Sequence, residues 1–456
     1  MRLWWGVAAL AAAGLGVAGA YWLPGLIRGV EAPIVIGLVH SRSGPLDVAA
    51  SGMLDAEVLA LEEINAAGGL LGRRVTWKII DGRSDPAEFG RAARRLIEED
   101  KAVMIVGGLT SACRAAMTDV TIPAGVLLIH AGLFEGMEDV KGWFGVGPLP
   151  NQQAMPAVSW CVDSLKARKF FLAGSRDVSS YAVHAVVRDQ LKALGLETVG
   201  EGFVGIDGSG VDELVAALKE SGADVVVSSI AGDANAGFFK RAAAAGLTPE
   251  KTPIVSLRIF EGDLPRLPSE ETAGHYVAAG YLQSLGGEAN RRFVERFKAR
   301  FGGDRTIGDP TASVYYGVKL WARAVEEAES TDLSELLEHL SRQSLNAGEG
   351  IIAVDYELIS AWRPFRVGKI RRDGQIDEVW ALDRSIRPVA YPIFRSVSAW
   401  RSLLAEWRST AGPGIGDAGS ARPPSSAGGP SSPPPPMAWR SPAAPRQAAS
   451  TRPEAR

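Results

Sequence analysis

The pattern of apolar and polar positions predicts buried strands that alternate with amphipathic helices. The first strand, residues 34–39, reads IVIGLV, and a helix with one apolar stripe follows it. The pair Gly68-Gly69 ends that helix, because glycine adopts the left-handed cap conformation at little cost. The apolar stripe of this helix consists of Leu54, Val58, Leu61 and Ile64. Further apolar runs predict strands at residues 75–80, 103–106, 126–129, 170–172, 225–229 and 254–256.

Most of these runs are apolar on both faces, as the strands of a buried parallel sheet must be. Their alternation with helices predicts a doubly wound α/β fold. Two such units follow each other, and the prolines Pro148 and Pro150 interrupt the pattern between them. A later helix at 309–328 and an antiparallel end at 351–382 complete the folded part. Two α/β lobes joined by crossing segments would form a hinge and a cleft.

The two ends of the chain differ from this body. Residues 1–30 carry Arg2, an apolar run and the small triplet at 18–20, which indicates a cleaved signal peptide or a retained membrane anchor. Residues 411–456 are rich in proline, serine and glycine, so we expect them to be disordered. Residues 396–410 form an amphipathic helix that we expect to pack on the body; docking to a partner or to a membrane surface is the alternative.

Composition and motifs argue against several function classes. The 456 residues have a net charge of −3 and a pI near 6.1, so no basic surplus suggests a nucleic-acid partner. Cys113 and Cys161 are too few for a disulfide framework and are expected to be small buried apolar residues, with pairing to each other as the alternative. The five histidines show no metal-binding spacing, and neither a nucleophile elbow nor a phosphate-binding loop is present. We therefore expect no enzyme, no metal and no cofactor.

The loops after the predicted strands carry the candidate chemistry. Hydroxyls and backbone N–H groups at helix N-termini donate hydrogen bonds to a carbonyl or carboxylate, although the same residues can be simple helix caps. Three such loops at one edge of the first sheet favour a ligand, and two loops with aspartates would face them from the second lobe. An aromatic side chain next to a carboxylate, as in the 134–135 loop, often lines a pocket for a small polar ligand. The candidate ligand-binding residues are Ser43, Thr110, Ser111, His130, Phe134, Glu135, Asp177 and Asp233.

Several longer motifs resemble one known family. Three segments are similar to type I periplasmic binding proteins of the branched-chain amino acid and amide class. They are H-S-x-S-G at 40–44, E-E-I-N-A-A-G-G-x-x-G at 62–72 and D-x-x-S-D-P at 81–86. T-S-A-x-R at 110–114 and G-D-x-N-x-x-F-F-K at 232–240 resemble the urea and short-chain amide subgroup. The resemblance extends over about residues 33–393.

This resemblance implies a two-lobed clamshell with a three-crossing hinge. The first lobe would comprise about residues 33–148 and 279–347, and the second about 149–278 and 348–393. The crossings would lie near Pro148–Asn151, Gly274–Tyr281 and Ala347–Ile351.

The same resemblance implies an extracytoplasmic or periplasmic solute-binding component of an ABC importer, whose partners are a permease and ATPase complex. A small polar amide-like or amino-acid-like ligand would bind in the cleft without catalysis. A ligand-sensing receptor that signals through a membrane anchor or a partner is the alternative function. Three positions depart from the subgroup, namely Leu109, Leu133 and Arg176, and an arginine in the pocket would favour a ligand with a carboxylate.

Overall fold

The computed structural model describes residues 32–44, 46–132, 134–138 and 141–410 of the chain. The predicted signal or anchor at 1–30 and the predicted tail at 411–456 lie outside these residues. Within them, no helix combines the length and the apolar character that crossing a membrane requires.

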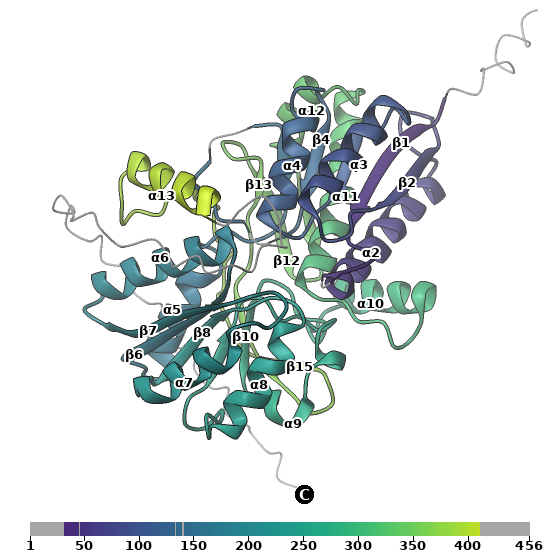
Figure 1. Ribbon diagram of the computed structural model, residues 1–456. Coiled ribbons are helices and arrows are strands. Elements are labelled where there is room, and N and C mark those ends of the chain that lie inside the picture. Colours follow the sequence, from purple (N-terminus) through teal and green to yellow (C-terminus); the bar gives the residue numbers. More distant parts are fainter. Residues whose placement is uncertain (1–31, 45, 133, 139–140, 411–456) are drawn as a thin grey trace, which may run out of the picture. The chain divides into compact units, whose positions relative to one another are not determined.

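The first lobe is built on an eight-stranded sheet, whose strand order is β11-β12-β13-β5-β4-β3-β1-β2. Figure 1 labels β1, β2, β4, β12 and β13 of this sheet. The parallel part consists of β1 (Ile34–His40), β2 (Val75–Asp81), β3 (Met104–Gly107), β4 (Leu127–His130) and β5 (Trp143–Gly145). An extension follows with β11 (Ser344–Ala347), β12 (Gly350–Asp355) and β13 (Ser360–Ala361). The helices are α2 (Asp47–Ala66), α3 (Pro86–Glu98), α4 (Ser111–Thr121), α10 (Glu288–Phe301), α11 (Asp309–Ala328) and α12 (Leu333–Leu340).

The second lobe is built on a seven-stranded sheet with the order β15-β14-β10-β9-β8-β6-β7. Its strands are β6 (Lys169–Ser175), β7 (Glu197–Val204), β8 (Val225–Ser229), β9 (Ile254–Ser256), β10 (Tyr276–Ala279), β14 (Arg366–Ile370) and β15 (Ile376–Ala381). The helices are α5 (Ala154–Ser164), α6 (Val178–Ala193), α7 (Val211–Ser221), α8 (Ala234–Ala244), the 3₁₀ turn η1 (Leu264–Arg266) and α9 (Ser269–Thr272). Separate apolar clusters fill the two faces of this sheet, so both faces are buried, as in a doubly wound fold.

The doubly wound α/β fold predicted from the sequence is therefore confirmed. The predicted strands at 225–229 and 254–256 coincide with β8 and β9, and the other five differ from the observed strands by a few residues. The strand β7 was missed, because it is an edge strand whose residues are mostly half-exposed and form no apolar run.

The chain passes between the two sheets three times, and the third passage lies later than expected. The first joins β5 to α5 and the second joins β10 to α10. We predicted the third near Ala347–Ile351, but β12 and β13 still pair within the first sheet, where Ser360 is the partner of Gly145. The third passage is therefore the 362–365 segment between β13 and β14, and residues 348–361 belong to the first lobe.

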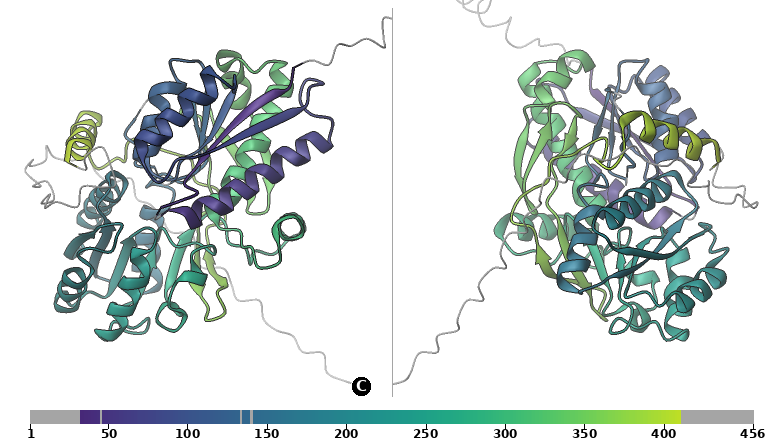
Figure 2. Two further views of the ribbon diagram at one scale, coloured as in Figure 1. Left: turned by 45° about the vertical axis from the view of Figure 1, so that its right-hand side comes forward. Right: turned by 90° about the vertical axis from the view of Figure 1, so that its left-hand side faces the viewer.

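The amphipathic helix expected at 396–410 is α13 (Val397–Thr410), and it packs on the body of the protein. Its buried side chains Trp400, Leu404 and Trp407 form one apolar cluster with residues of α6 and with Met137 of the first lobe. The right-hand view of Figure 2 shows α13 lying along α6. Near its end, Arg408 forms ion pairs with Glu135 and Glu138 of the first lobe, so α13 contacts both lobes.

Candidate functional site

A pocket lies between the two lobes, at the carboxyl ends of their parallel strands. Its space amounts to about 900 Å³, part of it open to solvent. Loops that follow β3, β4 and β5 line it on one side, and loops that follow β8 and β9 line it on the other. We call it the interlobe pocket. From the first lobe it is lined by Leu46, Leu109, Thr110, Ala131, Pro148, Asp309 and Pro310, and from the second by Ser179, Ala231, Gly232, Asp233, Ala236, Arg258, Phe260, Asp263, Arg266 and Leu267.

Two of the eight predicted ligand-binding residues, Thr110 and Asp233, line this pocket. Thr110 precedes α4, and its hydroxyl accepts a hydrogen bond from the Cys113 backbone N–H at 3.3 Å. It is thus both a helix cap and a pocket residue, and the N-terminus of α4 provides a partial positive charge beside it. Asp233 precedes α8, and its side chain is more than half exposed.

Three other predicted residues belong to a buried group that we call the Arg114 cluster, made of Ser111, Arg114, Phe134, Glu135 and Glu138. Ser111 donates a hydrogen bond to Glu135, and Arg114 lies 3.4 Å from Glu135 and 3.0 Å from Glu138. The guanidinium also stacks 4.4 Å from the Phe134 ring centre. In the described structure none of these residues is part of the pocket lining, and Arg408 of α13 also forms ion pairs with Glu135 and Glu138. Leu133, one of the three departures, lies outside the described residues.

Ser43 and His130 also lie outside the pocket lining of the described part. Ser43 is exposed, and its hydroxyl donates to the Asp81 carboxylate at 2.8 Å. His130 is buried at the end of β4, where Nδ1 lies 3.2 Å from the Gly107 carbonyl oxygen. Burial, together with the nearby Arg114 charge, lowers the pKa of His130 to about 3, so its imidazole is neutral at physiological pH.

Asp177 binds Arg258, a pocket residue that the sequence analysis missed. It caps α6 by accepting a hydrogen bond from the Ser180 backbone N–H at 2.8 Å, and it binds both terminal nitrogens of Arg258, at 2.7 and 3.1 Å. Burial opposes the charge of Asp177, but the Arg258 guanidinium outweighs it and lowers the pKa. Arg258 itself lines the pocket two residues after the predicted strand 254–256, so the rule that selected Thr110 could have found it.

Arg266 is a second pocket residue that the sequence analysis missed. Its Nη1 lies 3.2 Å from an Asp47 oxygen of the first lobe and 3.4 Å from an Asp233 oxygen of the second. It therefore connects the lobes beside the pocket.

Arg176, whose presence suggested a carboxylate ligand, is exposed, and its guanidinium lies 3.4 Å from the Ser209 hydroxyl. Within the described residues it is not part of the pocket lining.

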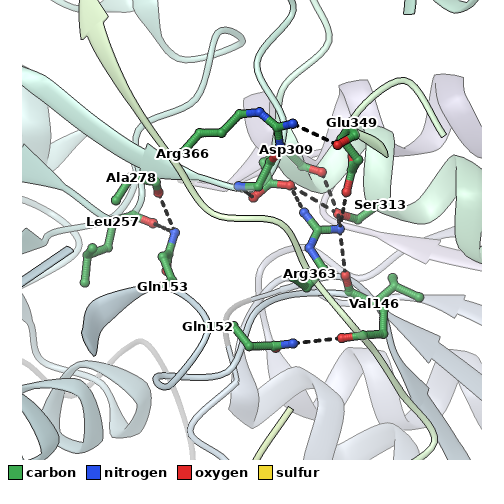
Figure 3. Close-up of polar contacts among 12 residues, drawn as sticks. Val146, Gln152, Gln153, Leu257, Ala278, Asp309, Ser313, Glu349, Arg363 and Arg366 are labelled. Atoms are coloured by element: carbon green, nitrogen blue, oxygen red, sulfur yellow. Dashed lines mark hydrogen bonds and ion pairs between the residues drawn. The ribbon is translucent and has the colours of Figure 1, made fainter. Parts of the chain in front are cut away.

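A buried group that we call the hinge cluster consists of Asp309, Ser313, Glu349 and Arg363 and is drawn in Figure 3. It also contacts the second passage, because Asp309 accepts a hydrogen bond from the Gly280 backbone N–H at 3.0 Å. Arg363 of the third passage donates hydrogen bonds to Asp309, to the Ser313 hydroxyl (2.6 Å) and to the Val146 carbonyl oxygen (3.2 Å), and it lies 3.2 Å from Glu349. Burial and the nearby Asp309 raise the pKa of Glu349 to about 7 against the effect of Arg363.

Gln153, which directly precedes α5, binds the backbone at β9 and β10 of the second lobe. The Gln153 side-chain amide donates to the backbone oxygens of Leu257 (3.0 Å) and Ala278 (2.7 Å), as Figure 3 also shows. These bonds fix the ends of β9 and β10, and β9 leads into the loop that carries Arg258.

The pocket loops of the first lobe approach each other so closely that one position requires glycine. A Cβ atom at Gly132 would overlap the backbone carbonyl of Leu109. We expect Gly132→Ala to lower the free energy of unfolding by about 1–3 kcal/mol, because the loops after β3 and β4 would have to separate. Denaturant unfolding measures this. Gly286→Ala is the control, since nothing lies within 4 Å of its Cβ position; equal stability of the two variants would contradict the expectation.

The family described as "Periplasmic binding protein domain" matches residues 34–397 of the chain, which is most of its length. The chain belongs to this family. Its fold is that of the type I periplasmic binding proteins of the branched-chain amino acid class.

Individual relatives agree with this membership. An "Amino acid binding protein" of Pseudomonas aeruginosa is 27% identical over 336 residues, which cover 69% of this chain and 84% of the relative. The solved substrate-binding protein LivJ of Streptococcus pneumoniae, in complex with isoleucine, is 21% identical with a TM-score of 0.69, covering 78% of this chain and all of LivJ. A solute-binding protein of an ABC transporter from R. palustris, in complex with 4-hydroxybenzoate, is 17% identical with a TM-score of 0.71, covering 77% of this chain and 97% of that one.

Proposed function

We propose that this protein is the extracytoplasmic solute-binding component of an ABC importer. It would bind a small polar ligand of the amino-acid or amide type in the interlobe pocket, without catalysis, and present the closed lobes to a permease and ATPase complex. The observation that carries this proposal is the pocket itself, which both lobes line with the loops at the carboxyl ends of their parallel strands. A periplasmic location and an N-terminal membrane tether belong to the same proposal.

The chemistry of the lining supports a polar ligand. The N-terminus of α4 at Thr110 offers backbone N–H groups to a carbonyl or carboxylate, and Asp233 faces the pocket from the other lobe. Apolar walls on both sides would cover the rest of the ligand. The names of the relatives, an amino-acid-binding protein and binding proteins for isoleucine and for 4-hydroxybenzoate, support the same class of function. The motifs resembling the urea and short-chain amide subgroup keep urea and amides among the candidates.

Calorimetry and thermal-shift measurements on the purified protein test the proposal. The panel comprises urea, acetamide and butyramide, leucine and isoleucine, 4-hydroxybenzoate, and small organic amines. We expect at least one solute to bind saturably with a stoichiometry of one, and to raise the melting temperature because it binds only the folded state.

A pocket-filling variant localises this binding. Ala231→Phe places a large side chain in the lining, so it should abolish the heat of binding while the protein remains folded. Binding that survives in this variant would place the site elsewhere, and the absence of binding by every solute of the panel would refute the proposed function.

A further inference from the structure

The interlobe pocket already neutralises its own positive charges. Arg258 is bound by Asp177 at 2.7 Å, and its side chain is only 9% exposed. Arg266 lies between two carboxylates, those of Asp47 and Asp233. Each guanidinium that lines the pocket therefore faces carboxylates of the protein, which weakens its attraction for an anionic ligand.

One carboxylate of the lining has no such partner. Asp263 accepts a hydrogen bond from the Phe260 backbone N–H at 2.9 Å. Throughout the described part of the chain, no lysine, arginine or histidine forms an ion pair with it. Burial and the nearby Asp233 raise its pKa to about 6, although Arg266 acts in the opposite direction. A cation placed beside this carboxylate would compensate its charge.

Part of the pocket lining that includes Asp263 is apolar. Leu46, Leu109 and Pro148 line the pocket from the first lobe, and Phe260 and Leu267 line it from the second. Such walls suit methylene groups, and a buried charge is tolerated only next to an opposite charge. The pocket therefore combines a carboxylate that forms no ion pair within the described residues with apolar lining that suits a short alkyl chain.

We propose that the ligand of the interlobe pocket is a small organic cation, with an ammonium group on a short alkyl chain, and that Asp263 is the residue that selects it. This inference rests on the proposed function and names the ligand class of the same site. A hydrogen bond between the ammonium and Asp263 would be charge-assisted on both sides, which makes it stronger than a neutral one. A plain aromatic acid would instead bring a further negative charge to a pocket that Asp263 and Asp233 already line.

Matched pairs of solutes test the selectivity without any variant. By calorimetry on the full protein, 1,4-diaminobutane is compared with butyramide, and L-lysine with L-norleucine, while 4-hydroxybenzoate serves as the anionic probe. In each pair we expect the solute with the additional ammonium to bind at least about tenfold more tightly, the effect of one charged hydrogen bond.

The variant Asp263→Asn tests the residue, because asparagine keeps the shape and removes the charge. We expect it to weaken the binding of 1,4-diaminobutane by about 10- to 100-fold and to leave the binding of butyramide unchanged. Asp304→Asn removes the same charge at an exposed position outside the lining, so it should change neither affinity.

The outcomes separate the two proposals. If butyramide, L-norleucine or 4-hydroxybenzoate binds as tightly as the cations, the pocket binds solutes but the cation inference is overturned. An equal loss of cation affinity in Asp263→Asn and Asp304→Asn would overturn the role of Asp263. If no solute binds at all, the proposed function and this inference fall together.

Discussion

Replacing Arg363 by methionine should destabilise the protein by about 3–5 kcal/mol, the usual cost of breaking a buried ion pair from one side. The Arg363 side chain is 1% exposed, and those of Asp309 and Glu349 are 2% and 0% exposed. Methionine fills a similar space but supplies neither charge nor N–H donors. Two carboxylates would then remain buried without their shared cation, and the Ser313 hydroxyl and the Val146 carbonyl would lose a donor.

Denaturant unfolding at neutral pH measures this loss, and two further variants make the result specific. Arg94→Met removes an arginine from an exposed pair with Glu98, where both side chains are more than 60% exposed, so we expect a change within about 0.5 kcal/mol. The double variant Arg363→Met with Glu349→Gln should recover part of the loss, because one of the two unpaired carboxylates is then removed. A loss below about 1 kcal/mol in Arg363→Met would show that the hinge cluster does not stabilise the fold.

Replacing Glu261 by glutamine should make the protein more stable than the wild type at high pH, but not at low pH. Glu261 is 1% exposed, and its carboxyl accepts a hydrogen bond from the Gln283 backbone N–H at 2.7 Å. Burial, reinforced by the negative charges of Asp309 and Asp263, raises its pKa from 4.5 to about 8. Glutamine keeps the acceptor oxygen and cannot ionise.

The direction of this pH effect on stability follows from the protons that the folded and unfolded states bind. Between pH 4.5 and about 8 the folded state keeps the Glu261 proton, whereas the unfolded chain has released it. The stabilisation from this group is therefore complete below pH 4.5 and is lost as the pH rises to about 8, by roughly 1.4 kcal/mol per pH unit. The wild type should lose stability relative to Glu261→Gln with this slope, and the difference should level off above the folded-state pKa.

Unfolding curves of both proteins at pH 5, 6, 7, 8 and 9 provide the comparison. The exposed Glu220 offers a control, since Glu220→Gln removes the same charge from the surface of α7. A stability difference between wild type and Glu261→Gln that does not change with pH would contradict the assigned burial effect.

The sheets illustrate how much of the fold could be predicted. Buried parallel strands such as β8 (VVVSS) and β9 (IVS) were found at their observed bounds, because a strand buried on both faces must be apolar throughout. The edge strand β7 (ETVGEGFV) was missed, since it is stabilised by pairing with β6 rather than by an apolar run. The third passage between the lobes was placed too early, because the pairing of Ser360 with Gly145 joins segments more than 200 residues apart.

The candidate site was predicted less completely. Thr110 and Asp233 were found because each follows a predicted strand and precedes a helix, which places them at the carboxyl edge of a sheet. Glu135 and Phe134 follow a strand as well, but Arg114 draws them into a buried cluster. Nothing in the local pattern distinguishes a carboxylate that faces a pocket from one that faces a buried arginine.

The sequence by itself determined the alternation of strands and helices, the α/β class, the two-lobed organisation and the family, because these depend on local periodicity and on long motifs. Only the tertiary structure decided which charges meet. Arg258 pairs with Asp177 across 81 positions, Arg266 with Asp47 across 219, and Arg363 with Asp309 across 54, while Asp263 forms no ion pair with any residue that the structure describes. Electrostatic pairing depends on distance in space rather than along the chain, and the ligand class inferred for the pocket follows from that pairing.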